Sequence, residues 1–275
     1  MDIKLIALDV DGTLLGSSQE VTPATVAALT RAAQAGIHIV LSTGRILPEC
    51  ELFLPKLPMI RYAILCTGAR VLDLRTGDLL FSCTIPESET KRLLHLLWDL
   101  DVQLQVFDPR DDHPHADKKR LDEGERFCGD LAKTMRLYYL AEEDFAGYVE
   151  RIDCPMIKIH MYFGSAEDQA EAIRRLQGEP YEVVATTTND LEINPQGSGK
   201  DVGLIKLAER LGLTSENIMA IGDGDNDISM LKIAGLPVAM ANGSEGTKAC
   251  AKYITDDCDH DGVANAIEKM LDGTL

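Results

Sequence analysis

Two carboxylates stand one residue apart near the N-terminus, in the stretch LDVDGTLL at residues 8–15. Asp9 and Asp11 lie at the end of the apolar run 3–10. This run predicts a strand that is buried on both faces of a parallel sheet. An extended chain sends alternate side chains to the same face, so both carboxylates can face one cleft. Acids placed there need a cation, a proton or solvent. Taken alone, the pair could also be a strand-end turn in which Gly12 supplies the backbone freedom.

A second acidic stretch, GDGDND at residues 222–227, follows another predicted strand. It adds Asp223, Asp225 and Asp227 at the edge where the carboxyl ends of parallel strands meet. Such a cluster repels itself unless a hard cation lies within it, and oxygen-only ligands favour Mg²⁺ over zinc. A calcium-binding EF-hand loop is a poor alternative, because no glutamate stands at the required position after Asp223.

Phosphate is the natural substrate for such a metal site, and two further stretches could bind it. STGR at residues 42–45 ends a predicted strand and combines a hydroxyl, a glycine that lets N–H groups approach an anion, and an arginine. Lys200 opens a predicted helix after a glycine-rich stretch, and a helix N-terminus with an ammonium group favours an anion. Each feature alone is also compatible with an ordinary turn or a solvated lysine.

The elements that must position these groups alternate between strand and helix. A helix is expected to begin after Thr22, with Pro23 in its first turn, and to end at Gly36. Strands are predicted at 37–44, 62–68, 236–241 and 252–255, a strand with an acidic loop at 217–227, and helices at 199–212 and 262–271. This rhythm predicts an α/β fold, a doubly wound, Rossmann-like parallel sheet core.

The middle of the chain differs, because its apolar runs are short and its aromatic residues cluster. We expect an inserted α+β domain at 84–187 and a core formed by 1–83 and 188–275. Helices are predicted in the insertion at 88–101 and 166–177, and strands at 103–107, 135–140, 156–163 and 181–186. The charged stretch 111–126 is expected to be an exposed loop or helix, and its two histidines are weak metal candidates.

Composition limits the classes of function. The chain has 275 residues, 45% of them hydrophobic and 26% charged, and no apolar run as long as a membrane span. No basic, apolar signal peptide opens it, so a cytoplasmic protein is expected. The net charge of −18 disfavours nucleic acid and anionic membranes as partners. Seven scattered cysteines without a C-x-x-C pair indicate neither disulfides nor a thiolate zinc site. Monomer and homodimer both stay open.

Four motifs together resemble those of the haloacid dehalogenase superfamily. They are D-x-D-G-T at 9–13, T-G-R at 43–45, Lys200 and G-D-x-x-N-D at 222–227. The C-terminal stretch from GLPVAMAN to GVANAIEKML is similar to the Cof-type branch, the subclass IIB phosphatases. The resemblance covers both ends of the chain, whereas the insertion resembles the family only in length and position.

The resemblance implies an Mg²⁺-dependent phosphatase that acts on small metabolites, such as sugar phosphates or phosphorylated cofactor precursors. Asp9 would attack phosphorus and form an aspartyl-phosphate, and Asp11 would carry protons to the leaving group and from water. The implied metal ligands are Asp9, Asp11, through its backbone carbonyl, and Asp223. The implied phosphate-binding residues are Val10, Thr43, Gly44, Lys200 and Asn226.

Two further residues have supporting roles in this interpretation. Asp227 would orient Lys200 or metal-bound waters, while Arg45 would either contact the substrate or form a structural ion pair. The chain departs from the family by carrying Thr67 where an asparagine is usual, which puts a leaving-group contact there in doubt. Relatives with this arrangement use the insertion as a lid that selects the leaving group.

Two alternative functions would use the same site residues. A phosphomutase would pass the phosphoryl group to a second substrate hydroxyl instead of water, and a non-catalytic sensor would bind a phosphorylated ligand without turnover. A receiver domain also uses an aspartate and a lysine in an acidic pocket, but it would be about half this length.

Overall fold

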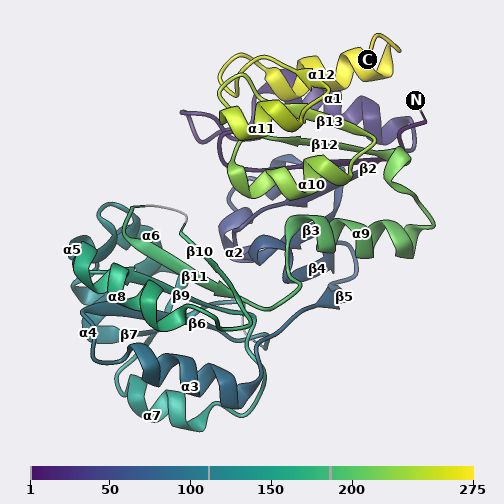
Figure 1. Cartoon of the computed structure of the whole chain (residues 1–275). Coiled ribbons are helices and arrows are strands. Elements are labelled where there is room, and N and C mark those ends of the chain that lie inside the picture. The colour runs from purple at the N-terminus through teal and green to yellow at the C-terminus, as the bar shows by residue number, and fades with distance from the viewer. Residues whose placement is uncertain (1, 111, 186–187) are drawn as a thin grey trace. The chain divides into compact units, whose positions relative to one another are not determined.

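The computed structural model describes residues 2–110, 112–185 and 188–275 and divides the chain into two compact units (Figure 1). Unit 1 comprises Met1–Ser82 and Gly199–Leu275, and unit 2 comprises Cys83–Ser198. The expected boundary at residue 187 lies outside the described residues. The assignment of 188–198 to the core is wrong, because β11 (Asp190–Asn194) pairs with β9 (Lys158–Phe163) inside unit 2.

Unit 1 is built on an eight-stranded sheet with the order β14-β13-β12-β1-β2-β3-β4-β5. Its strands are β1 (Leu5–Leu8), β2 (His38–Ser42), β3 (Ile60–Leu65), β4 (Arg70–Asp73), β5 (Asp78–Ser82), β12 (Ile218–Gly222), β13 (Leu236–Ala239) and β14 (Tyr253–Ile254). Strands from β14 to β3 in this order run parallel, which confirms the predicted α/β core. An antiparallel hairpin, β4 and β5, was not predicted and extends the sheet beyond β3.

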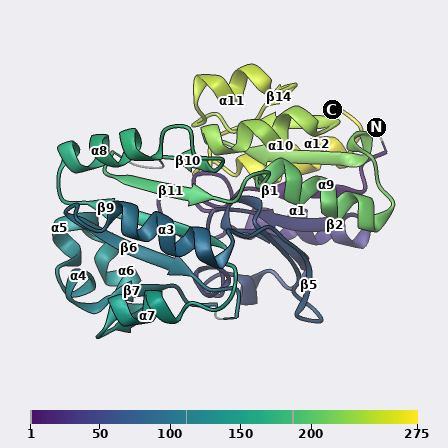
Figure 2. The ribbon, with the colours of Figure 1, turned by 60° about the horizontal axis from the view of Figure 1, so that its bottom comes forward.

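Helices cover both faces of this sheet, with α1 and α12 on one side and α9 and α10 on the other (Figure 1). The helices of unit 1 are α1 (Pro23–Gln34), α2 (Leu47–Cys50), α9 (Lys200–Leu211), α10 (Ile228–Ile233), α11 (Glu245–Cys250) and α12 (Gly262–Leu271). The start of α1 is as predicted, because the Thr22 hydroxyl caps it by accepting from the N–H of Thr25. Unit 1 contains both the first strand and the last helix, so unit 2 is an insertion within it (Figure 2).

Unit 2 has a six-stranded sheet with the order β10-β11-β9-β6-β7-β8. Its strands are β6 (Val102–Phe107), β7 (His115–Asp117), β8 (Leu140–Glu142), β9, β10 (Glu182–Val184) and β11. Its helices are α3 (Glu87–Leu97), α4 (Lys118–Asp122), α5 (Gly124–Cys128), α6 (Leu131–Tyr138), α7 (Phe145–Arg151) and α8 (Ala166–Leu176). Apolar side chains of α3, α7 and α8 pack on one face of the sheet and form its core.

One predicted strand of unit 2 is wrong. Residues 135–140 fall largely in α6, where Ala132 and Met135 are buried one turn apart, as on the inner face of a helix. The adjacent aromatic pair Tyr138-Tyr139 favoured a strand in the sequence. The charged stretch 112–126 is more ordered than a loop, because it contains β7, α4 and the start of α5.

Gly203 lies where α9 approaches β3 most closely. A Cβ atom there would lie 2.6 Å from the Ile64 Cγ2 atom and 3.3 Å from the Gly68 carbonyl oxygen. We therefore expect Gly203→Ala to lower the free energy of unfolding by about 1–3 kcal/mol, the usual range for overpacking. The intrinsic helix preference of alanine acts in the opposite direction, by about 1 kcal/mol.

Urea denaturation monitored by circular dichroism measures this change. Glu209→Ala, an exposed change on the same helix, is the control and should alter the free energy by less than about 0.5 kcal/mol. A Gly203→Ala protein that is as stable as the wild type would contradict a net cost of overpacking at this contact.

Candidate active site

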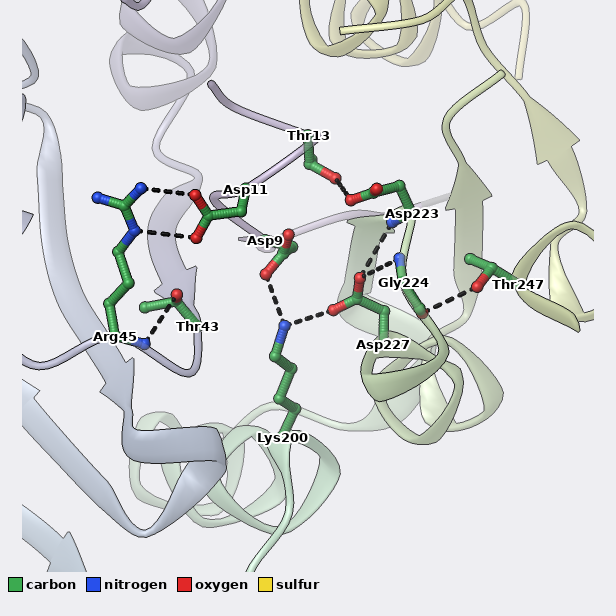
Figure 3. Close-up of polar contacts among 10 residues, drawn as sticks. All are labelled: Asp9, Asp11, Thr13, Thr43, Arg45, Lys200, Asp223, Gly224, Asp227 and Thr247. Atoms are coloured by element: carbon green, nitrogen blue, oxygen red, sulfur yellow. Dashed lines mark hydrogen bonds and ion pairs between the residues drawn. The ribbon is translucent and has the colours of Figure 1, made fainter. Parts of the chain in front are cut away.

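A buried lysine joins three distant segments of unit 1 (Figure 3). Lys200, the first residue of α9, has no exposed side-chain surface. Its Nζ lies 2.6 Å from Asp9 Oδ1 and 2.5 Å from Asp227 Oδ1. Asp9 follows β1, and its N–H donates to the carbonyl of Ile221 on β12 at 3.0 Å, so the pairing of these strands places it beside the 222–227 loop. The convergence expected from the sequence is therefore present for these residues.

Burial and charge act against each other in this group. Burial raises the pKa of Asp9 to about 7, although the neighbouring Lys200 opposes the change. Burial alone would lower the pKa of Lys200, but Asp9 and Asp227 outweigh it and hold that pKa above its usual range. Burial also raises the pKa of Asp223, against the hydrogen bond from Thr13. A site with these shifts is a candidate for chemistry, since perturbed carboxylates gather at functional sites.

Asp227 is held so that it can orient Lys200. Its second carboxylate oxygen accepts from the N–H groups of Asp223 and Gly224, each at 3.0 Å. Gly222 leaves the space that Asp227 occupies, because a Cβ there would lie 2.5 Å from the Asp227 Cγ atom. The predicted role of Asp227 in orienting Lys200 stays a prediction.

Three carboxylates form a group that can hold a metal ion. One oxygen from each of Asp9, Asp223 and Asp227 lies within 4.8 Å of the others. The Thr13 hydroxyl donates to Asp223 Oδ1 at 2.8 Å and fixes that carboxylate. Oxygen donors without sulfur or imidazole suit Mg²⁺, so the residues present fit the ion expected from the sequence.

The side chain of Asp11 does not join the metal group. It lies against Arg45, whose Nε and Nη2 contact the two carboxylate oxygens at 2.9 and 2.5 Å (Figure 3). Burial would lower the pKa of Arg45, but its hydrogen bonds and charge pairing with Asp11 raise that pKa. Of the two roles predicted for Arg45, the structure displays the ion pair, and any contribution of Asp11 to a metal falls to its backbone carbonyl.

The expected phosphate-binding residues lie in the same region of unit 1. Thr43 is buried after β2, and its hydroxyl accepts from the N–H of Arg45 at 3.2 Å. Val10 is fully buried after Asp9, Gly44 is partly exposed, and Asn226 is exposed in the acidic loop. Their roles in phosphate binding stay predictions.

Asn242, in the loop after β13, is a site residue that sequence reasoning missed. Its amide donates to the Gly12 carbonyl at 2.8 Å and contacts Asp223 Oδ2 at 3.4 Å. It therefore links the two acidic stretches. The signal was its place in the quoted VAMAN stretch, directly after a predicted strand that ends at the same sheet edge.

A turn at residues 66–68 has strained backbone angles and bonds the loop that carries Thr43 and Arg45. Cys66 and Thr67 have φ values of +51° and +55°, which non-glycine residues rarely adopt. Their N–H groups donate to the carbonyls of Arg45 and Thr43 at 3.1 and 3.0 Å. Gly68 follows with φ +93°, and a Cβ there would lie 1.9 Å from the Gly199 carbonyl oxygen. The turn thus connects the 43–45 loop with the start of α9.

The strain at Thr67 gives a test. Asparagine tolerates the left-handed region better than a β-branched residue, so we expect Thr67→Asn to raise the free energy of unfolding by roughly 1 kcal/mol. Chemical denaturation measures the gain. Thr274→Asn, an exposed change outside that region, should give none. Destabilisation by Thr67→Asn alone would mean that the threonine side chain contributes more than the strain costs.

Comparison with known proteins agrees with this geometry. The family model described as haloacid dehalogenase-like hydrolase matches residues 6–267. The chain is 32% identical to a 5-amino-6-(5-phospho-D-ribitylamino)uracil phosphatase of Bacillus subtilis, over 98% of this chain and 97% of that protein. It is 27% identical to a pyridoxal phosphate phosphatase of Escherichia coli, over 98% of this chain and all of that protein.

Solved structures share the fold. A haloacid dehalogenase-like hydrolase from Bacteroides thetaiotaomicron has a TM-score of 0.84 and 30% identity, and the match covers 98% of this chain and 99% of that one. A subclass IIB sugar phosphatase has a TM-score of 0.80 at 22% identity over 97% and 98% of the two chains, which supports the fold. Within residues 2–110, 112–185 and 188–275, no helix has both the length and the apolar character needed to cross a bilayer.

Proposed function

This chain belongs to the haloacid dehalogenase-like hydrolases and is a phosphoric monoester hydrolase, and we propose that it dephosphorylates small metabolites through a covalent phosphoryl group on Asp9. The observation that carries the proposal is the buried contact of Lys200 with Asp9 and Asp227. This contact holds one carboxylate oxygen of Asp9 and leaves the other oxygen of the same carboxylate for attack on phosphorus. The carboxylate group of Asp9, Asp223 and Asp227 supports a site for Mg²⁺ beside this contact.

The reaction would proceed in two steps. Asp9 attacks phosphorus as the ester bond breaks, and Asp11 gives a proton to the leaving oxygen. Water then attacks the aspartyl-phosphate while Asp11 takes a proton from it, and phosphate leaves. When bound, Mg²⁺ would offset charge between the phosphate and Asp9, held by Asp9, Asp223 and the backbone carbonyl of Asp11. The groups proposed to bind the phosphoryl oxygens are Val10, Thr43, the Gly44 N–H, Lys200 and Asn226.

The contact with Arg45 limits when Asp11 can transfer a proton. In the described conformation both carboxylate oxygens of Asp11 accept hydrogen bonds from the Arg45 guanidinium. Donation of a proton to the leaving group requires that Asp11 first leave Arg45. We therefore assign Arg45 the role of holding Asp11 after it has given its proton to the leaving group and until it takes one from water.

The substrate is proposed to be a phosphorylated cofactor precursor or a sugar phosphate. Three relatives carry 5-amino-6-(5-phospho-D-ribitylamino)uracil in their names, and another carries pyridoxal phosphate. Unit 2 would act as the lid that recognises the leaving group. Transfer to a second hydroxyl, the mutase reaction, would appear as isomerised product without free phosphate.

Replacement of Asp9 tests the nucleophile. Asp9→Asn should lower phosphate release from a panel of metabolite phosphates by at least about a thousandfold, because an amide cannot form the acyl phosphate. Removal of Mg²⁺ with EDTA should also abolish release, and added Mg²⁺ should restore it. Asp225→Asn, an exposed change in the acidic loop, is the control and should stay within twofold of wild type, by the small effect expected of exposed residues. Full activity of Asp9→Asn would refute the proposal.

Replacement of Asp11 tests the proton donor. Asp11→Asn should slow hydrolysis of an alkyl phosphate by about a hundredfold, within the range for general acid catalysis. Release of p-nitrophenolate from p-nitrophenyl phosphate in the first step should fall much less, since this leaving group departs as a stable anion. Release of the leaving alcohol or p-nitrophenolate, measured under single-turnover conditions, reports the first step alone, whereas phosphate release also includes hydrolysis of the intermediate. Equal losses on both esters would contradict an acid role.

A further inference from the structure

Asp223 is the member of the metal-binding group that the buried lysine does not hold. One oxygen from each of Asp9, Asp223 and Asp227 lies within 4.8 Å of the others. Among the described residues, the ammonium of Lys200 donates to Asp9 and Asp227 and makes no hydrogen bond to Asp223. Like charges repel at this separation, so the Asp223 carboxylate would turn away from the other two unless further groups held it.

Two neutral side chains supply donors to Asp223, one to each of its oxygens. The hydroxyl of Thr13 donates to Oδ1 at 2.8 Å, and the amide nitrogen of Asn242 contacts Oδ2 at 3.4 Å. The same nitrogen donates to the Gly12 carbonyl at 2.8 Å. A side-chain amide nitrogen carries two hydrogens, so it can serve both acceptors at once. Asn242 therefore connects the carboxylate to the backbone of the loop that follows β1.

A third contact fixes the orientation of the Asn242 amide. Its oxygen accepts from the N–H of Cys258, in the loop between β14 and α12, at 3.0 Å. If the amide were turned over, its oxygen would face the Gly12 carbonyl and the Asp223 carboxylate, and its nitrogen would face an N–H group. The hydrogen-bond network thus selects one orientation, in which the donor faces the metal-binding group.

The backbone around Asn242 is also held in place. The N–H of Gly243 donates to the Met240 carbonyl at 2.9 Å, and the N–H of Ser244 donates to the Asp223 carbonyl at 2.9 Å. A Cβ atom at Gly243 would lie 3.1 Å from the same Asp223 carbonyl oxygen. This turn therefore packs against the backbone of Asp223, while the Asn242 amide reaches its side chain.

The bond to the Gly12 carbonyl acts on another proposed metal ligand, the backbone carbonyl of Asp11. That carbonyl shares its peptide group with the Gly12 N–H, which donates to the Leu15 carbonyl at 2.9 Å. The next carbonyl, of Gly12 itself, accepts from Asn242. Gly12 has a φ of +78°, and a Cβ atom there would collide with the Asp223 carboxylate, so this backbone passes directly beside that side chain. Asn242 thus holds the Gly12 backbone and the Asp223 carboxylate together.

We propose that Asn242 is a positioning residue that sets the affinity of the site for Mg²⁺, because it holds two of the proposed ligands at a fixed separation. Mg²⁺ requires near-octahedral geometry at short distances, so its binding depends strongly on how its ligands are spaced. Groups that hydrogen-bond to metal ligands typically contribute about 10- to 100-fold to metal affinity. The inference rests on the metal ligands of the proposed function and adds to them a residue that does not bind the metal itself.

Calorimetric titration of the full chain with MgCl₂ tests this role. We expect Asn242→Ala to raise the dissociation constant for Mg²⁺ about tenfold. The side chain is exposed, so the change should leave folding intact. The Mg²⁺ concentration that gives half-maximal phosphate release from p-nitrophenyl phosphate should rise by about the same factor.

Asn265→Ala is the matched control. The Asn265 amide also donates to a carboxylate and a carbonyl, those of Asp256 at 2.8 Å and His260 at 3.3 Å, and neither belongs to the metal-binding group. This change should keep the dissociation constant within about twofold of the wild-type value. Thermal midpoints measured in EDTA report whether both variants are folded. Added Mg²⁺ should raise the midpoint less in Asn242→Ala than in the control, because a ligand stabilises according to its affinity.

The outcomes separate the inference from the function on which it rests. A folded Asn242→Ala protein that binds Mg²⁺ as tightly as the wild type would overturn the role of Asn242, and Asp9-dependent phosphate release would still stand. Equal losses of affinity in Asn242→Ala and Asn265→Ala would also overturn it, because the effect would then come from a general loss of stability. A wild-type chain that bound no Mg²⁺ would refute the proposed metal site and, with it, the inference.

Discussion

The ammonium group of Lys200 is fully buried, and its two carboxylate partners come from segments that follow different strands. A buried ammonium without partners would be strongly destabilising, so Asp9 and Asp227 must both be in place when α9 packs on the sheet. Asp9 is placed by the pairing of β1 with β12, and Asp227 is placed by the short turn after β12. Formation of the unit 1 sheet and formation of the site are therefore one event.

The same constraint explains the close packing around the start of α9. Lys200 reaches the sheet edge only if the helix begins near β3, and the glycines at 68, 199 and 203 allow that approach. The turn at Cys66 and Thr67 adopts a left-handed backbone and bonds the 43–45 loop. Residues in such conformations persist where the surroundings determine them, and here the surroundings are the lysine helix and the arginine loop.

The sequence predicted the parts of unit 1 whose signals are local. Apolar runs, the cap at Thr22 and acids after strands identified the parallel core and brought Asp9, Lys200 and Asp227 to one edge. It could not predict the pairing of Asp11 with Arg45, because side-chain direction depends on packing between loops distant in the chain. The second half of the helix at 131–138 was mistaken for part of a strand at 135–140, because adjacent tyrosines weigh more in a short window than one turn of buried residues.

Strand periodicity could have identified the buried polar residues on one face of β6, β9 and β11, but the rule that buried strands are apolar hid them. In KIHMYF, residues 158–163, the alternation of charged or aromatic and apolar side chains is visible. Such alternation normally means that one face of the strand meets water, and here that face is buried as well.

The two units bury polar groups in different ways. Unit 1 concentrates net negative charge, three carboxylates against one ammonium, which a dication would offset. Unit 2 pairs its buried charges, Lys158 with Glu192 and His160 with Asp190, and leaves the amide atoms of Gln103 unpaired among the described residues. The buried charges of unit 2 are thus compensated within that unit, whereas those of the unit 1 site call for a cation.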